Sequence, residues 1–227
     1  HSIRAARTSV EQHKEVPLIR LGMVPLVGIR AFSQVVGSLQ ASHMLPRLQI
    51  QMGTVEVLLQ ALHEGRIDGF VGFLDETTTQ VNLSKFQITA LWEERMVVAA
   101  SRTHPLTGRK KVTLEMTLDQ DWIMMPRPSS NRRALERLFL GQGLAPPIPF
   151  IEVESFHIAL SVVSGGQFIA AVPESAYFQY ESQVSMLRLA VDFPVNKMVF
   201  VNLANGPDLP ALDRIFELFH AQARHDG

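Results

Sequence analysis

The 227-residue chain is 46% hydrophobic and 19% charged, a composition that supports a packed core and excludes a disordered chain. Its formal net charge is -1 and its Lys and Arg residues are scattered, which excludes a basic stripe of the kind that neutralises nucleic-acid phosphates. It has no cysteine, so disulfides, thiolate nucleophiles and cysteine-based zinc sites are excluded and a reducing compartment is favoured.

The first residues are polar and precede the first apolar run. His1 and Ser2 are typical of a tag remnant, and residues 3–15 (IRAARTSVEQHKE) favour a helical linker that ends before Pro17. The chain lacks a starting Met, so we expect it to be part of a longer protein. No apolar run reaches the roughly 18 residues that span a bilayer, and the N-terminus has no signal-peptide pattern.

Strand and helix patterns alternate through the first third of the chain. Strands are predicted at 18–24, 48–52 and 69–73. Between them lie two helical patterns, whose apolar faces carry Ile29, Phe32, Val35, Val36 and Leu39 in the first, and Val55, Leu58, Leu59 and Leu62 in the second. Gly65 is expected to end the second helix. Such alternation predicts a parallel sheet covered by helices.

The same alternation returns after two further strands at 87–91 and 95–100. Strands are predicted at 122–125, 150–153, 168–172, 185–189 and 197–203, and helices at 132–140 and 155–163. Leu212, Ile215, Phe216 and Phe219 form the apolar face of a last helix. The chain is therefore predicted to be an α/β protein with two units.

Sequence signatures of catalysis are absent. The chain has no GxSxG, GxGxxG, GxxxxGK[ST] or HExxH motif. Two acidic pairs, Glu93 with Glu94 and Glu152 with Glu154, are interpreted as solvated strand-end charges, and His63 and His157 as helix residues that cap or pack, although either group is able to act as acid or base. We expect no enzymatic activity, no metal and no cofactor.

Four strand-to-helix loops are rich in small, proline and hydroxyl residues. In open parallel sheets, ligands bind beyond the carboxyl ends of the strands, where helix N-termini present unpaired N–H groups. The candidate binding residues are Pro25, Leu26 and Val27 in the first loop, Gly53, Thr54 and Val55 in the second, Pro126, Ser129 and Ser130 in the third, and Glu154, Ser155 and Phe156 in the fourth.

The hydroxyl and amide residues of these loops have two interpretations. Ser129, Ser130 or Asn131 can cap the helix that follows, or can offer hydrogen bonds to an anionic ligand. Thr54 can likewise cap its helix or contact a ligand. Both interpretations remain open at this point.

Five segments, taken in order, resemble the effector-binding domain of LysR-type transcriptional regulators over residues 17–222. They are IRLGMVPLVG, LQALHEGRIDGFVG, LWEERMVVAASRTHPL, WIMMPRPSSNRRALERLF and VVSGGQFIAAVP. Within them, the Gly65 to Asp68 step is similar to the family's "G-x-hydrophobic-D", and His104-Pro105-Leu106 to its "HPL".

The resemblance implies a type 2 periplasmic-binding-protein fold, with two Rossmann-like lobes joined by two crossing strands. Lobe I would comprise 17–98 and 200–227, lobe II 99–199, and 1–16 the tag and linker remnant. A winged helix-turn-helix domain would precede this chain, so DNA contact would belong to that missing domain. We therefore expect a cytoplasmic, ligand-sensing and dimerisation domain of a bacterial regulator, with no membrane association.

In this family the effector is held by the same four loops and by the residues after the third strand, Gly72 and Phe73. Where many members carry Ser or Thr in the first loop, this chain has Leu26, which removes one hydroxyl partner for a carboxylate. The resemblance implies a metabolite effector, for example from aromatic or sugar catabolism. An anionic effector would then depend on Thr54, Ser129, Ser130 and backbone N–H groups.

The resemblance also implies self-association as a dimer or tetramer. The first helix, 28–40, would face the helix at 132–140 of an antiparallel partner, and closed two-fold dimers are the commonest assembly. An alternative of the same fold is an extracytoplasmic solute-binding protein of an uptake system. A third hypothesis is a small hydrolase or lyase that uses His157 or an acidic pair.

Overall fold

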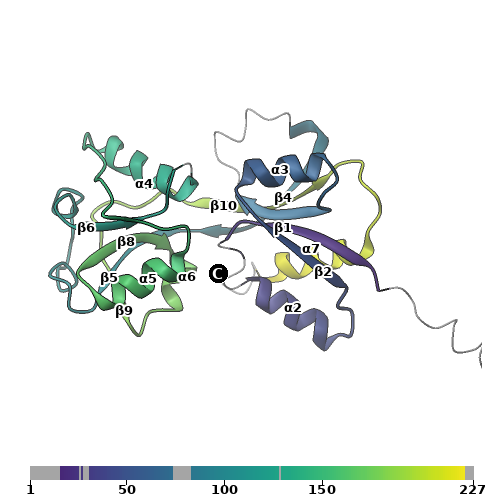
Figure 1. Cartoon of the computed structure of the whole chain (residues 1–227), viewed down its shortest axis with the longest axis horizontal. Helices are drawn as coiled ribbons and strands as arrows, with labels where there is room; N and C mark the ends of the chain where they lie inside the picture. Colours follow the sequence, from purple (N-terminus) through teal and green to yellow (C-terminus); the bar gives the residue numbers. More distant parts are fainter. Residues whose placement is uncertain (1–15, 26, 28–30, 74–82, 128, 223–227) are drawn as a thin grey trace, which may run out of the picture.

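The computed structural model describes residues 16–25, 27, 31–73, 83–127 and 129–222. Its strands form two five-stranded sheets, in the orders β2-β1-β3-β10-β4 and β7-β6-β8-β5-β9. Each sheet is the centre of one lobe, and the lobes lie side by side (Figure 1). We call them the first lobe and the second lobe.

In the first lobe, helices cover both faces of the sheet, with α3 on one face and α2 and α7 on the other (Figure 1). The strands are β1 (Leu18–Met23), β2 (Arg47–Met52), β3 (Gly69–Phe73), β4 (Phe86–Glu94) and β10 (Asn196–Leu203). The helices are α2 (Ala31–Ala41), α3 (Val55–His63), α7 (Pro210–Gln222) and the 3-10 turn η2 (Leu83–Lys85). All three predicted strands and both helices of the first α/β unit are found, although residues 28–30 lie outside the described part.

The second lobe repeats this layering, with α4 on one side of its sheet and α5 and α6 on the other (Figure 1). Its strands are β5 (Met96–Ser101), β6 (Asp121–Met124), β7 (Ile151–Glu152), β8 (Phe168–Pro173) and β9 (Val184–Met186). Its helices are α4 (Ser130–Gly141), α5 (Phe156–Gly165), α6 (Glu174–Phe178) and the 3-10 turn η3 (Glu115–Thr117). The short α6 was not predicted, and the strand expected to reach Leu189 ends at Met186.

The second helical unit shows why the apolar spacing works as a predictor. The side chains of α3 at positions i, i+3, i+4 and i+7 are all buried, namely Val55, Leu58, Leu59 and Leu62. The helix ends at His63, and Gly65 follows the C-cap residue Glu64 with a φ of 68°, which suits a residue without Cβ. Amide N–H groups of Gly65 and Arg66 donate to the carbonyls of Leu62 and Ala61, respectively, and so satisfy the helix end.

The motif residues that follow these elements have structural roles. The Asp68 carboxylate accepts a hydrogen bond of 2.7 Å from the backbone N–H of Arg20, which fixes the chain beside β1. In the second lobe, His104 is buried and its Nδ1 accepts a hydrogen bond from the Leu106 N–H. Burial lowers the pKa of His104, because the charged ring would lose its hydration.

The parallel strands predicted from the alternation are found, and each sheet also contains antiparallel strands. Strands β1, β2 and β3 are parallel, as are β6, β7 and β8. However, β10 runs antiparallel to β3 and β4, and β5 runs antiparallel to β8 and β9. The reason is that β5 and β10 belong to connections that cross between the lobes rather than to βαβ units. Each crossing chain must enter its sheet against the direction of the strands already there.

The crossing is made where β4 ends and β10 begins. Asn196 is paired with Glu94 in this antiparallel ladder, and Met96 begins β5 in the other sheet. Described strands thus change sheet between Glu94 and Met96, and again before Asn196. The lobe boundaries expected at residues 98 and 199 stay a prediction.

The interpretation of Glu94 as a solvated charge is wrong. Its side chain is buried at the crossing, whereas that of Glu93 is exposed. The Glu94 carboxylate accepts a hydrogen bond of 3.1 Å from the backbone N–H of Ser175 in α6. Burial raises the pKa of Glu94, and the hydrogen bonds from Ser175 oppose this only in part. An acidic group therefore connects a crossing strand to a helix of the second lobe.

Among the described helices, none has both the length and the apolar character needed to cross a bilayer.

We predict that Glu94 makes the chain less stable as the pH rises. Its pKa is raised in the folded state, so the folded chain holds this proton more tightly than the unfolded chain does. The contribution to stability is complete below the ordinary pKa of 4.5 and is lost as the pH rises through the folded-state pKa. Urea midpoints measured from pH 4 to pH 8 should show wild type losing stability relative to E94Q.

The matched control is E93Q, which replaces the exposed neighbour on the same strand. Its urea midpoint is measured over the same pH range. A pH-independent difference between wild type and E94Q would show that the buried carboxyl does not titrate abnormally.

Candidate functional site

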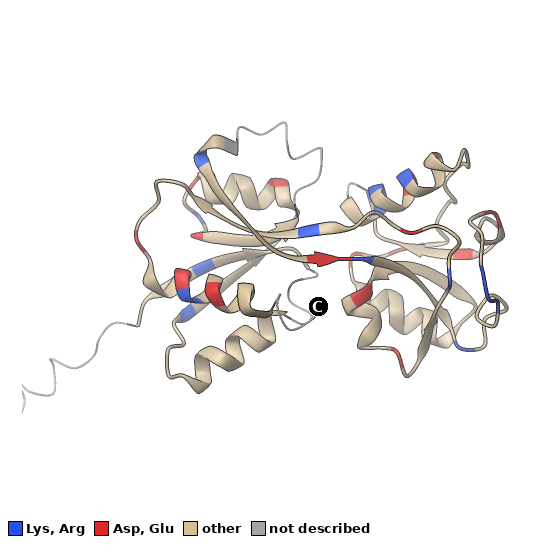
Figure 2. Cartoon of the chain, turned by 180° about the vertical axis from the view of Figure 1, so that it is seen from behind, with Lys and Arg blue, Asp and Glu red and all other residues tan. Residues whose placement is uncertain are grey.

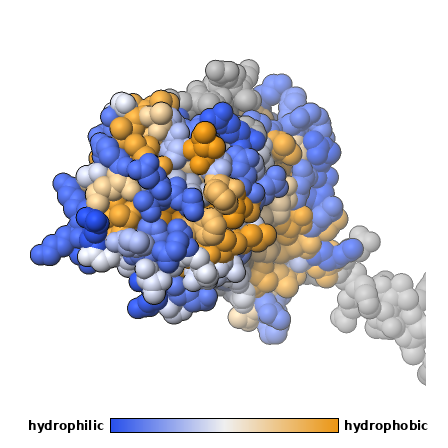
Figure 3. All heavy atoms as spheres, turned by 60° about the vertical axis from the view of Figure 1, so that its left-hand side comes forward, coloured by the Kyte–Doolittle hydropathy of each residue, from blue (hydrophilic) through white to orange (hydrophobic). Residues whose placement is uncertain are grey.

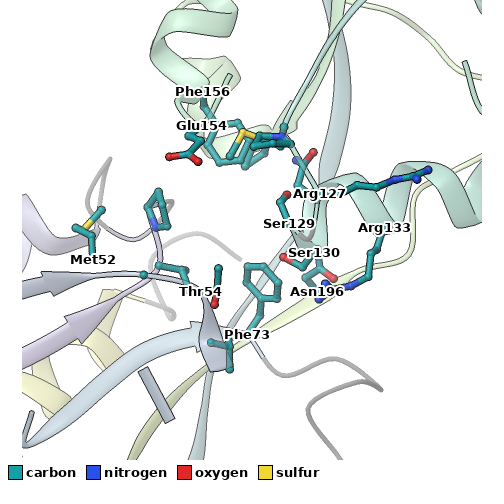
Figure 4. A pocket seen from close by; sticks show the side chains of 18 of the residues that line it. Met52, Thr54, Phe73, Arg127, Ser129, Ser130, Arg133, Glu154, Phe156 and Asn196 are labelled. Atoms are coloured by element: carbon teal, nitrogen blue, oxygen red, sulfur yellow. The ribbon is translucent and has the colours of Figure 1, made fainter. Parts of the chain in front are cut away.

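A cavity of about 340 Å³ lies between the two lobes. It is formed at the carboxyl ends of β1, β2 and β3 on one side and of β6, β7 and β8 on the other. Because the lobes face each other with these ends, loops from both lobes surround the same space (Figure 4). This size is within the range of pockets that take small molecules.

Ten of the candidate residues line the cavity and thus come together from segments far apart in sequence. They are Pro25, Gly53, Thr54, Val55, Phe73, Pro126, Ser129, Ser130, Glu154 and Phe156. Leu26 lies outside the described residues. Their roles in binding stay a prediction.

Three candidates do not line this cavity. Val27 is buried in the core. Gly72 packs against Val24 and Val55, because a Cβ added to it would lie 3.3 Å from Val24 and 3.4 Å from Val55. The Ser155 hydroxyl accepts a hydrogen bond from the Ile158 N–H and caps α5. These residues support the loops that carry the cavity wall.

Asn131, which the sequence also offered as a possible ligand contact, lines the cavity too. Sequence reasoning missed other residues of the wall, which are Val24, Met52, Glu56, Met96, Met125, Arg127, Arg133, Pro173 and Asn196. Val24, Met52 and Met125 adjoin candidate residues at strand ends, so the rule that found the loops was able to find them too. Met96 and Asn196 lie on the crossing strands, and no local signal marks them. Glu56 and Arg133 lie on α3 and α4, and a charged residue on a helix is not by itself a signal of a binding site.

The apolar part of the wall is rich in methionine and phenylalanine. Met52 comes from the first lobe, Met96 from the crossing and Met125 from the second lobe, with Phe73 and Phe156 on opposite sides (Figure 4). Thioether side chains are flexible and polarisable and make favourable contacts with rings. Such a wall suits a ligand whose body is apolar.

Four polar side chains of the wall lie together on one side of the cavity. In Figure 4, Ser129, Ser130, Arg133 and Asn196 lie near one another, with Thr54 across the cavity from them. Ser130 and Arg133 belong to the first turn of α4, and Asn196 begins β10. Polar contacts to a ligand are therefore available from both lobes and from the crossing strand.

The two N-cap residues in the wall behave differently. The Ser129 hydroxyl accepts a hydrogen bond of 3.2 Å from the Arg132 N–H and so caps α4. Thr54 is the N-cap residue of α3, but its side chain makes no capping hydrogen bond. Capping is thus realised at Ser129, while the hydroxyl of Thr54 is not used by its own helix.

Asn131 follows Ser130 but its amide is engaged in packing. Its Nδ2 donates to the Ala171 carbonyl and to the Sδ of Met96, each at 3.4 Å. This amide joins the start of α4 to strands of the second-lobe sheet. Of the two roles considered for it, the cap of α4 is supplied by Ser129 instead, and contact with a ligand stays a prediction, since Asn131 also lines the cavity.

Arg132 holds the start of α4 from behind. Its side chain is 6% exposed, and it donates to Glu136 at 2.8 Å and to Glu152 at 3.2 Å. Arg127 donates to the same Glu136 carboxylate at 2.6 Å. Burial acts to raise the pKa of Glu136, but the two arginines outweigh it and lower that pKa. This network fixes α4 against the edge strand β7, and it places Glu152 in an ion pair.

The residues considered for catalysis do not form a constellation in the cavity. His157 lies on α5 with its Nδ1 3.4 Å from the Tyr180 hydroxyl, away from the cavity wall. His63 is at the exposed C-terminal end of α3. Within the described part of the chain, no group of three His, Asp or Glu residues is arranged to hold a metal ion.

Lys and Arg positions and Asp and Glu positions both occur along the ribbons of the two lobes (Figure 2), in agreement with the formal net charge of -1.

Comparisons with known proteins agree with this architecture. The model of the LysR substrate binding domain matches residues 12–224. The transcriptional regulator BenM of Acinetobacter baylyi is 29% identical over 163 residues, which are 69% of this chain and 51% of that protein. The chain spans about half the length of the curated relatives it matches.

Solved structures show the same fold. The effector-binding domain of QuiR in complex with shikimate has a TM-score of 0.75 at 19% identity, and the match covers 92% of this chain and 98% of that one. The BenM effector-binding domain with its effector benzoate has a TM-score of 0.73 at 24% identity, over 92% and 93% of the two chains.

The chain belongs to the LysR substrate binding domain family. Its fold is that of the type 2 periplasmic-binding proteins, with two Rossmann-like lobes joined by crossing strands. The resemblance and the fold class expected from the sequence are confirmed.

We predict that replacing the two N-cap residues will affect stability differently. S129A should lower the free energy of unfolding by about 1 kcal/mol, because it removes the acceptor for the Arg132 N–H. T54V should lower it by less than about 0.5 kcal/mol, because no capping bond is lost. Urea unfolding of both variants against wild type provides the comparison. Equal losses would contradict the assignment of the cap to Ser129 alone.

Proposed function

We propose that this chain is the ligand-sensing domain of a bacterial LysR-type transcriptional regulator and binds a small-molecule effector in the cavity between its lobes. The observation that carries the proposal is the cavity itself, formed by strand ends of both lobes and by the crossing strands. A ligand that contacts both lobes has a different affinity for each lobe arrangement. Its binding therefore shifts the populations of these arrangements.

Control of transcription would require parts beyond this chain. We propose that DNA is bound through a helix-turn-helix domain N-terminal to this chain, and that the protein works in the cytoplasm, where that DNA lies. The family match and the regulators among its relatives support this proposal over an uptake solute-binding protein of the same fold. They also favour a binding domain over an enzyme.

The proposal predicts that a metabolite stabilises the chain through the cavity. A ligand bound only by the folded state, at about 100 times its Kd, adds roughly 2.7 kcal/mol to the stability. A thermal-shift screen of metabolites should therefore find a compound that raises the melting temperature of wild type. T54Y, which fills part of the cavity, should abolish this shift.

The control is T103Y, which changes an exposed threonine of the second lobe that does not line the cavity. It should retain the shift. A compound that stabilises wild type and T54Y equally would contradict binding in this cavity.

We further propose that two copies of the chain associate as an antiparallel dimer. Two apolar groups lie next to edge strands: Met44 and Leu45 precede β2, and Ile148 and Phe150 precede β7. Ile148 is 90% exposed and Phe150 is 73% exposed, and Leu140 is exposed at the end of α4. Figure 3 looks toward the second lobe and shows apolar side chains at its surface. In a two-fold antiparallel pair, the group of one copy beside β2 meets the group of the other beside β7.

A double variant tests this association. I148E with F150E should convert a dimer into a monomer in sedimentation experiments. The double variant puts four carboxylates into each dimer, and each would be buried against the apolar group of the other copy without a compensating partner. I158E is the control, since Ile158 is 53% exposed on α5, away from these edge strands. A wild-type chain that is monomeric at high concentration, or a double variant that still dimerises, would contradict the proposal.

A further inference from the structure

The charged residues of the cavity wall differ in whether the protein itself supplies their partners. The Arg133 guanidinium of α4 lies 4.0 Å from the Glu56 carboxylate of α3, and both residues line the cavity. The Arg127 guanidinium, also in the wall, donates to the Glu136 carboxylate at 2.6 Å. Glu154 is exposed, and in the part of the chain that the structure describes its carboxylate has no hydrogen bond and no ion pair.

The two arginines of the wall are thus committed to groups of the protein. Glu136 holds Arg127 and also accepts from Arg132 at 2.8 Å. Arg133 has a further contact besides the carboxylate of Glu56. An anionic ligand group would have to compete with these contacts, whereas a cationic group would meet a carboxylate that no described residue pairs with.

The helix starts at the cavity also have acceptors within the protein. A helix N-terminus carries a partial positive charge, which favours an anion. In α3 a carboxylate of the first turn, that of Glu56, already occupies this position. At α4 and α5 the hydroxyls of Ser129 and Ser155 accept hydrogen bonds from the N–H groups of Arg132 and Ile158. These groups offset part of the attraction that the helix ends have for an anionic ligand.

The surroundings of Glu154 suit a cation with an apolar body. Glu154 follows β7 and is two residues before Phe156, which is also in the wall. Figure 4 shows its side chain on the side of the cavity away from Arg127 and Arg133. An ammonium group forms a strong, charge-assisted hydrogen bond to a carboxylate. The ring faces of Phe73 and Phe156 attract cations as well.

We propose that the effector is a mainly apolar molecule with a protonated amino group, which is bound by the Glu154 carboxylate. The inference rests on the proposed function, because it concerns the same cavity. The apolar body of the ligand would lie against Met52, Met96 and Met125. Binding of this kind pairs the free carboxylate of the wall and leaves the existing ion pairs of the protein intact.

The test uses amine and alcohol pairs of the same shape, 2-phenylethylamine with 2-phenylethanol and hexylamine with 1-hexanol, titrated by calorimetry at neutral pH. At least one amine should bind wild type more tightly than its alcohol. E154Q should weaken that amine by about 5- to 15-fold, between the loss for an exposed ion pair and that for a hydrogen bond to a charged group. The alcohol should bind E154Q and wild type equally, because it carries no charge.

The decisive measurement is charge reversal. E154K should reverse the preference, so that 3-phenylpropanoate binds more tightly than 2-phenylethylamine. A variant with a damaged cavity would instead lose the amine, the acid and the alcohol together. The matched control is E181Q, which neutralises an exposed carboxylate of the second lobe that does not line the cavity. It should bind the amine like wild type, because it alters the net charge by the same amount as E154Q.

Several results would overturn the inference. Amines that bind no better than their alcohols up to 10 mM, equal weakening by E154Q and E181Q, or an unchanged preference in E154K would each do so. If a neutral or anionic metabolite stabilises wild type and fails with T54Y, the cavity is the site and only this inference fails. If no metabolite does so, the proposed function itself fails.

Discussion

The antiparallel pairing of β4 with β10 is the constraint on which the rest of the molecule depends. It brings two distant parts of the chain to the same point, Glu94 and Asn196, and sends both into the second lobe. Because of this pairing, the carboxyl ends of both sets of parallel strands face one space. The crossing also supplies wall residues directly, since Met96 and Asn196 line the cavity.

The crossing includes an unfavourable element. Glu94 is a buried carboxyl whose hydrogen bond to the Ser175 N–H does not fully compensate for its burial, so its pKa is raised. A hydrophobic residue would avoid this cost but would leave the N–H without its acceptor. The carboxyl connects α6 to the crossing strand, at the position where the chain passes from one lobe to the other.

Neighbouring residues at the start of α4 make different contacts. Ser129 caps the helix, Asn131 binds it to the sheet, and Arg132 anchors it from behind through Glu136 and Glu152. Ser130 and Arg133 remain on the cavity side (Figure 4). A helix start that is held so firmly can present polar groups at a defined position. This is what a binding wall requires when its apolar part is built from flexible methionines.

The sequence by itself determined the fold class and about half of the cavity wall. Apolar spacing located α3 and the parallel strands, and the rule that ligands bind at strand carboxyl ends led to Pro25, Thr54, Ser130 and Glu154, because these signals are local in the chain. Only the tertiary structure decided that Glu94 is buried, that β10 runs antiparallel, and that Arg133 faces Glu56. These facts depend on contacts between residues at least 77 positions apart in the chain. Local sequence patterns carry no information about such pairs. The family resemblance supplied the two crossing strands, while the physical environment of each charge came from the packing of one lobe against the other.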